Sequence, residues 1–141
     1  MKRNLTLIAT VMMMVLSLSS FATEKISPAK DLASNTLISN YLDASVLGKQ
    51  KLVKNMLAEN FEFINTSDNS KSTKKEYSKF LDKTNNLTYD CTTKYEVLDQ
   101  SGNAAVAKVT MKFENFTRVD LINMSNTAEG WKINQVISNF L

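Results

Sequence analysis

The sequence contains no histidine and a single cysteine, Cys91, in 141 residues. Without histidine the chain cannot form a Ser-His-Asp triad, a zinc site that needs imidazole, or a histidine acid–base pair. One cysteine can form neither an internal disulfide nor a thiolate metal site. We therefore expect no metal ion and no cofactor, and a fold that is stabilised by its hydrophobic core.

Glycine and arginine are also scarce. The three glycines, Gly48, Gly102 and Gly130, are scattered singly, so no glycine-rich loop can hold a phosphate group. Arg118 is the one arginine beyond the first few residues, which excludes a clamp of several arginines on a phosphate. The acid–base chemistry left open is that of a carboxylate acting without histidine.

The charge of the chain does not favour a nucleic-acid partner. The 17 basic residues include Lys2 and Arg3, and without these two the balance is 15 basic against 14 acidic side chains. Nucleic-acid binding usually needs a clustered basic face. The densest basic stretch, residues 71–79, is diluted by Glu76, and we expect it to be the solvated face of a helix. No nucleic-acid partner is expected.

The first 22 residues have the pattern of a secretory signal peptide. Lys2 and Arg3 supply the positive start, residues 5–18 form an apolar run, and Ser20-Phe21-Ala22 places small residues where a signal peptidase reads them. The alternative is a retained membrane anchor, but the run is shorter than the roughly 20 residues of a spanning helix. We expect cleavage after Ala22, export to the periplasm or beyond, no membrane attachment afterwards, and one domain over residues 23–141.

The N-terminal half of this domain predicts helices. Ser27 followed by Pro28 suits a helix start, because serine caps free N–H groups and proline is tolerated at the first helical position. This helix should end at Gly48. The elements expected next are a short helix over 52–57, a brief strand over 61–64, a loop over 65–72 and a third helix that a capping box of Thr73 and Glu76 opens.

Apolar residues at spacings of three and four mark the helical faces that should be buried. The expected buried positions are Leu37, Ile38, Tyr41, Leu42 and Val46 in the first helix, Leu52, Val53, Met56 and Leu57 in the second, and Tyr77, Phe80 and Leu81 in the third.

The C-terminal half changes to a period of two, which is typical of strands. Long strands are expected over 87–97, 105–113, 116–125 and 131–140. Glu114-Asn115 could form a tight turn that sets Phe113 across from Phe116. Helices followed by a meander of strands predict an α+β fold, in which a curved antiparallel sheet wraps the N-terminal helices that alone can cover its apolar face. Two sets of residues in the third strand compete for the inner face: Val119 and Leu121 against Ile122 and Met124.

Several segments resemble one family. Residues 116–124 (Phe-Thr-Arg-Val-Asp-Leu-Ile-Asn-Met) and, after a turn, residues 129–133 (Glu-Gly-Trp-Lys-Ile) are similar to the last two strands of the putative lumazine-binding subfamily. Residues 104–109 resemble its middle strand, and Tyr41-Leu42-Asp43 its opening helix. The subfamily belongs to the nuclear transport factor 2-like superfamily, so the resemblance implies a cone-shaped, cystatin-like fold. It implies no particular ligand.

Asp120 has the strongest claim to a chemical role. Aspartate is uncommon within strands, and Arg118, two residues earlier, should lie on the same face and hold Asp120 ionised. This favours a fixed ion pair, which could also orient a ligand. The remaining alternative is catalysis of the kind seen in ketosteroid isomerase, which has this fold and an aspartate base. Here Asp120 would act with Tyr41, Tyr89 or Tyr95.

Aromatic residues could line a pocket inside the cone, although aromatic residues at strand spacing are more often plain core. Tyrosine is of most interest, because a buried hydroxyl group needs a partner. Cys91 is expected to be a small buried residue rather than a nucleophile. The candidate ligand-binding residues are Tyr41, Tyr89, Tyr95, Arg118, Asp120 and Trp131.

Three functions follow from these features. The leading hypothesis is a non-enzymatic exported domain that binds a small, partly apolar molecule in the cone, or forms a homodimer through its sheet face. The alternatives are an isomerase-like or lyase-like enzyme with Asp120 as the base, and a module whose sheet binds another protein. An enzyme predicts Asp120 in a pocket, near a tyrosine hydroxyl and away from Arg118. A ligand binder predicts a cavity with few polar groups, whereas a protein-binding module predicts a filled cone and an apolar outer face.

Overall fold

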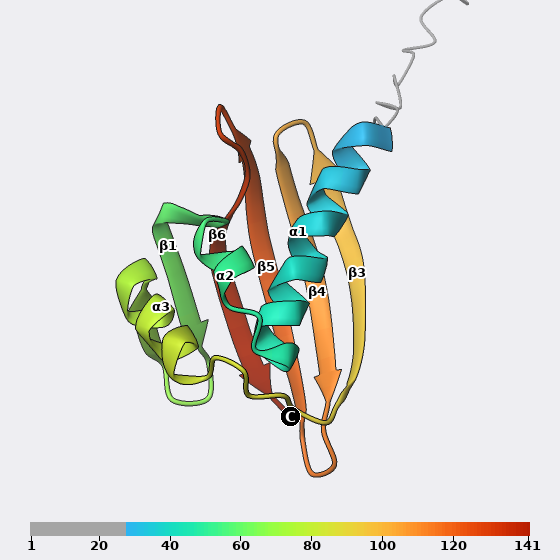
Figure 1. The fold of residues 1–141 in the computed structure, drawn as a ribbon. Helices are drawn as coiled ribbons and strands as arrows, with labels where there is room; N and C mark the ends of the chain where they lie inside the picture. The colour runs from blue at the N-terminus through green and yellow to red at the C-terminus, as the bar shows by residue number, and fades with distance from the viewer. Residues whose placement is uncertain (1–27) are drawn as a thin grey trace, which may run out of the picture.

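The computed structural model describes residues 28–141, and the expected signal peptide and its cleavage site lie outside this range. The α+β class is confirmed, with helices first and most of the strands after them (Figure 1). The elements are α1 (Pro28–Leu47), α2 (Lys51–Lys54), β1 (Leu57–Asn65), β2 (Ser70–Thr73), α3 (Lys74–Lys83), β3 (Thr92–Ser101), β4 (Ala104–Lys112), β5 (Thr117–Thr127) and β6 (Gly130–Phe140).

The strands form one sheet in the order β2-β1-β6-β5-β4-β3. The prediction of a wholly antiparallel sheet was wrong for one pair, because β1 runs parallel to β6. Register shifts at Val97/Asp99 and at Asn123/Met124 are irregularities of the kind that bend a sheet. In Figure 1, α1 crosses one face of this sheet while α3 lies beside β1.

The core lies between α1 and the inner face of the sheet. Ile38 and Tyr41 of α1 are fully buried, as their spacing predicted, and so are Ala107 and Val109 of β4. On β5, Ile122 is buried while Leu121 is 37% exposed, so the even-numbered residues of this strand point inward. This settles the competition between the two faces of the third predicted strand.

The predicted helix boundaries hold where local chemistry specifies them. Gly48 follows the end of α1 with a φ of 65°, as predicted, whereas the predicted cap Ser27 lies outside the described residues. Thr73 accepts a hydrogen bond from the N–H of Glu76, and the Glu76 carboxylate accepts one from the N–H of Thr73, as in the predicted capping box. None of the helices within residues 28–141 is long and apolar enough to cross a membrane.

Three predictions of local structure were wrong. The short second helix ends at Lys54, since Leu57 already begins β1. Leu52 and Phe80, both expected to be buried, are 45% and 51% exposed. The predicted loop over 65–72 is largely a hairpin that adds β2 to the sheet edge. The strand β3 begins at Thr92 rather than at residue 87, because the chain before it is held by α1 instead of by β4: the Tyr89 N–H donates to the Val46 carbonyl oxygen.

Gly48 fixes the position of that preceding segment, residues 84–91. The Asn86 N–H donates to the Gly48 carbonyl oxygen at 3.1 Å. A Cβ atom on Gly48 would lie 2.6 Å from the Asn86 nitrogen, closer than real side chains approach. Position 48 therefore requires glycine both for its positive φ and for the close approach of the two backbones.

Candidate functional site

Asp120 and its partners form a buried polar cluster on the inner face of β5 and β6. Asp120 is fully buried, and its carboxylate is held on both oxygens. Arg118 Nε donates to Oδ1 at 2.9 Å, Arg118 Nη2 lies 2.8 Å from Oδ2, and the Tyr41 hydroxyl donates to Oδ2 at 2.7 Å. A fork of this kind is the strong, directional form of an ion pair.

The secondary structure brings these groups together from three elements. Arg118 and Asp120 share a face because they are two residues apart on β5. Ser138 of β6 is the direct cross-strand neighbour of Asp120, and its Oγ accepts a hydrogen bond from Arg118 Nε at 3.0 Å. Tyr41 reaches the same point from α1. Tyr41, Arg118, Asp120 and Ser138 are called the polar cluster below.

The electrostatics keep Tyr41 protonated and Arg118 charged. Burial, and then the Asp120 carboxylate, raise the pKa of Tyr41 well above 10.0, so its hydroxyl stays protonated and donates. Burial also raises the pKa of Tyr77, and the opposing effect of Arg118 offsets only part of this rise. Burial alone would lower the pKa of Arg118, but Tyr41 and Asp120 raise it by more, so the guanidinium stays charged.

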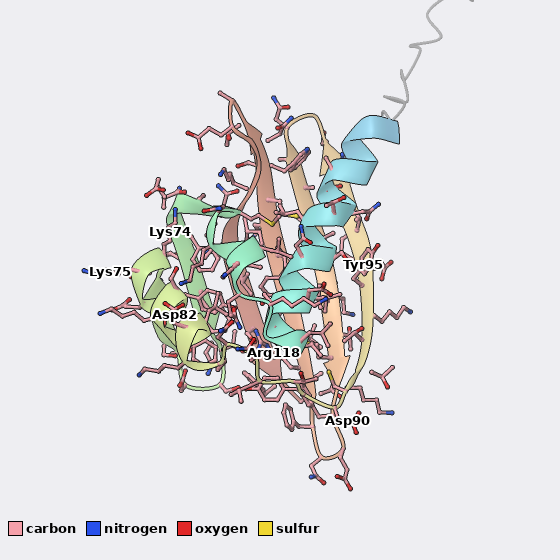
Figure 2. All side chains as sticks on the ribbon, viewed as in Figure 1. Lys74, Lys75, Asp82, Asp90, Tyr95 and Arg118 are labelled. Carbon is pink, nitrogen blue, oxygen red and sulfur yellow. The ribbon has the colours of Figure 1, made fainter. Side chains whose placement is uncertain are left out.

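A cavity of about 380 Å³ adjoins the polar cluster at the C-terminal end of α1. Figure 2 shows Arg118 at this end of the helix. We call the cavity the aromatic pocket, because aromatic rings supply half of its lining residues. It is lined by Ala44, Ser45, Tyr77, Phe80, Leu81, Thr84, Tyr89, Met111, Phe113, Phe116, Arg118 and Phe140.

The aromatic rings of the pocket pack against one another. Phe113 stacks on Phe116 with ring centroids 4.4 Å apart, as the predicted tight turn between them implied. Tyr89 meets the edge of Phe113, and Phe140 lies against Phe116. Three of these rings are at least 40% exposed: Tyr89, Phe116 and Phe140. The pocket therefore opens to solvent through an aromatic rim.

Few polar groups reach the pocket. The Arg118 side chain is 16% exposed and is the one charged group in the wall. Ser45 Oγ is buried and has no hydrogen-bond partner within residues 28–141. The Asp120 carboxylate is not part of the wall, since it lies behind Arg118 and Tyr41. A cavity of this size with an apolar wall and few polar groups has the character of a small-molecule site.

The structure brings together four of the six predicted site residues. Tyr41, Arg118 and Asp120 form the cluster, and Tyr89 lies in the adjoining wall. Tyr95 is 41% exposed on β3, at the far edge of the sheet (Figure 2). Trp131 packs against the core at the start of β6, and neither of these two lines the pocket.

Several residues of the site were missed from the sequence. Ser138 could not be recognised without the β5–β6 register that places it opposite Asp120. Phe140 and Ser45 are ordinary strand and helix residues whose neighbours become visible only in the fold. A signal did exist for Phe116, because the predicted turn paired it with Phe113.

Other chemistry is not assembled in the part of the chain that the structure describes. No group of three or more cysteine, aspartate or glutamate residues there could hold a metal ion. Burial, and then Asp90, raise the pKa of Cys91, so its thiol is less readily ionised than a free one. Cys91 was expected to be buried, and it is only partly buried against the core.

Solved structures similar to this chain share its fold at low sequence identity. An NTF2-like protein of unknown function from Silicibacter pomeroyi has a TM-score of 0.68 and 10% identity, covering 82% of this chain and 100% of its own. An NTF2-like protein of unknown function from Shewanella baltica has a TM-score of 0.63 and 15% identity, with coverages of 82% and 98%. A ketosteroid isomerase-like protein from Erwinia carotovora atroseptica has a TM-score of 0.61 and 12% identity, with coverages of 82% and 98%.

These similarities establish the nuclear transport factor 2-like fold. No curated protein sequence matches the chain significantly. The family model described as "Putative lumazine-binding" matches residues 29–136, which is well over half of the chain and includes α1, the polar cluster residues of β5 and most of β6. The chain therefore belongs to the putative lumazine-binding family of nuclear transport factor 2-like proteins.

Proposed function

We propose that this protein binds a small, largely apolar molecule in the aromatic pocket. The observation that carries the proposal is an open cavity of about 380 Å³ in which aromatic walls surround a single fixed arginine. The exposed rings of the rim support it, because grouped apolar surface in contact with water is unfavourable and a ligand would cover it. The pocket also has the few polar groups that orient a ligand.

The geometry favours binding over acid–base catalysis by Asp120. A general base must reach the proton that it removes, but Arg118 and Tyr41 occupy the Asp120 oxygens and separate them from the pocket. The enzyme hypothesis required Asp120 near a tyrosine and away from Arg118, and the second condition is not met. In the proposed function Asp120 positions Arg118 for a ligand.

The family description suggests a first probe. Lumazine is a flat heteroaromatic molecule with carbonyl acceptors, and this chain belongs to a family described as "Putative lumazine-binding". A flat ring suits walls made of stacked phenylalanines, and a carbonyl oxygen suits an arginine donor.

Native mass spectrometry of the protein purified from its own host tests the proposal. We expect the native protein to be heavier than the chain alone, and the extra mass to be lost on denaturation. If no molecule is retained, added lumazine should give a saturable adduct. A Ser45→Trp variant should lose the adduct, because the indole would fill the pocket. Ser39→Trp on the exposed side of the same helix is the matched control. No adduct in either experiment, or equal adducts in both variants, would contradict the proposal.

We further propose that the outer face of the sheet pairs with a second copy of the chain. A single row across five strands contains Ile64, Ile137, Leu121, Lys108 and Glu96, which are successive cross-strand neighbours. Its centre is apolar and partly exposed, while Lys108 and Glu96 give it no net charge. Such a row can meet its own copy without like-charge repulsion at its centre.

Sedimentation velocity over a range of concentrations tests this pairing. We expect a dimer that Leu121→Glu weakens by at least about tenfold, because a charge would be placed at the apolar centre. Asn103→Glu, at the exposed β3–β4 turn, should leave the dimer intact. A wild-type protein that stays monomeric throughout would overturn the pairing.

Export by an N-terminal signal peptide is also a proposal. Its support is the sequence pattern of the first 22 residues, together with a family match that begins only at residue 29. The denatured mass of the protein from its own host tests it. A chain that begins at Thr23 is expected, and a chain that retains Met1–Ala22 in the exported fraction or stays in the cytoplasm would contradict it.

A further inference from the structure

The two sides of the Arg118 guanidinium differ. On one side, Nε and Nη2 are held by Asp120, Ser138 and Tyr41. On the other side, Nη1 carries two N–H donors that take no part in these hydrogen bonds, and the Tyr77 hydroxyl, which also belongs to the pocket wall, is a further partner of the guanidinium. Because Arg118 lines the aromatic pocket, this side is available to a molecule inside it.

We propose that the ligand is a small aromatic acid, whose carboxylate accepts hydrogen bonds from Arg118 Nη1 and whose ring lies against the aromatic wall. This inference rests on the proposed function and names the chemical class that the aromatic pocket selects.

The charge distribution of the wall selects an acid over a base. No acidic residue lines the pocket, so a ligand cation would meet Arg118 without a compensating carboxylate. Ser45 Oγ, buried and unpartnered, can donate a second hydrogen bond to an acceptor oxygen. A carboxylate offers two acceptor oxygens and forms charge-assisted hydrogen bonds, which are stronger than those of a neutral carbonyl group.

The guanidinium is fixed before a ligand arrives. Asp120 and Ser138 hold its inner edge, and its Cζ atom lies 5.7 Å from the Phe63 ring centroid and 5.9 Å from that of Phe140. These ring contacts restrict the guanidinium further. A donor that is already oriented loses little conformational entropy when an acid binds, which favours affinity and discrimination.

Isothermal titration calorimetry with a matched naphthalene series tests the assignment on the unaltered protein. The probes are 2-naphthoate, 2-naphthamide and (naphthalen-2-yl)methylammonium, which share a ring system and differ in the charge of one substituent. We expect naphthoate to bind about tenfold more tightly than the amide, and the ammonium compound to bind more weakly than both.

The outcomes separate the two levels of the proposal. Equal affinities of naphthoate and naphthamide, or tighter binding of the ammonium compound, would overturn the acid assignment while leaving a pocket that binds aromatic molecules. No binding by any probe at millimolar concentration would overturn both proposals. Naphthoate binding that survives Ser45→Trp would place the acid outside the pocket and would also overturn the assignment.

A conservative variant then attributes the discrimination to Arg118. Arg118→Lys keeps a cation beside Asp120 but loses the planar fork, so we expect the preference for naphthoate over naphthamide to fall about tenfold toward equality. An unchanged preference in the folded variant would contradict the role of Nη1. If the variant does not fold, the probe series on the wild-type protein still decides the assignment.

Discussion

The strands β5 and β6 have two halves that face the same interior with opposite chemistry. In one half, Ile122 of β5 pairs directly with Val136 of β6, and both are fully buried in the core. In the other half, two residues away along each strand and on the same face, Asp120 pairs with Ser138, and both are also fully buried. The apolar half is closed by packing, whereas the polar half adjoins an open pocket.

In the proposed function, this difference lets a single sheet support both stability and binding. Apolar pairs need no orientation, so they fill the centre of the cone and contribute through burial. Buried polar groups must each find a partner, which fixes Asp120 and Tyr41 and holds Arg118 in one orientation at the wall of the aromatic pocket. The polar half is therefore the part of the interior that can recognise a ligand.

The largest effect should come from removing Asp120. Asp120→Ala leaves Arg118 and Tyr41 buried without their common acceptor, and we expect the free energy of unfolding to fall by about 3–5 kcal/mol. Chemical denaturation followed by circular dichroism measures this. A double variant, Arg118→Met with Asp120→Leu, should recover most of the loss, because no unpaired charge is left. A loss below about 1 kcal/mol in Asp120→Ala would show that the ion pair is not needed.

Gly48→Ala should lower the free energy of unfolding by at least about 2 kcal/mol, because a positive φ is combined with a backbone clash against Asn86. The matched control is Gly102→Ala, which has a similar φ of 55° but open space around its Cβ position, and about 1 kcal/mol is expected there. The difference in unfolding free energy measures how tightly residues 84–91, which carry Tyr89 of the pocket, are docked. Equal losses in both variants would mean that this docking is loose.

Tyr41→Phe should lower the free energy of unfolding by about 1–3 kcal/mol, because Asp120 loses a buried hydrogen bond while the ring is kept. Tyr95→Phe, on the exposed edge strand, should change it by less than about 0.5 kcal/mol. Thermal and urea unfolding of the two variants would give the comparison. Similar values for both would mean that the Tyr41 hydroxyl adds nothing to the polar cluster.

The smallest expected effect is a loss of folding stability at alkaline pH. Tyr41 and Tyr77 have folded-state pKa values raised above the unfolded value of about 10, so the folded protein holds these protons more tightly. Their contribution to stability is complete below that unfolded pKa and is lost as the pH rises through the folded pKa. We expect the urea midpoint to decline above about pH 10, and to decline less in Tyr41→Phe. An identical decline in both proteins would contradict a raised pKa for Tyr41.

The sequence predicted those parts of the molecule that local chemistry specifies. Strand periodicity predicted the strand β4, the capping box predicted the start of α3, and the i, i+2 spacing placed Arg118 beside Asp120. These features depend on neighbours within a few residues, and therefore they can be recognised in a single sequence. Dimerisation, export and the ligand itself stay predictions.

The parts that the sequence could not give depend on pairing between distant segments. The parallel contact of β1 with β6 and the position of Ser138 opposite Asp120 follow from register, which no local pattern contains. Tyr89 and Tyr95 have the same spacing pattern, yet one lines the pocket and the other is at the sheet edge, because residues 84–91 bend toward α1. Tertiary contacts thus decide which of two residues with the same sequence pattern belongs to the site.

The most direct test of the central claim is a ¹H–¹⁵N correlation spectrum of the protein titrated with 2-naphthoate. Binding in the aromatic pocket predicts saturable shifts at Ala44, Ser45 and Tyr89 and at the Arg118 side chain, with none at Leu121 or Lys108 on the outer face. Shifts confined to the outer face, or no saturable shift at any residue, would contradict the assignment of this pocket as the binding site.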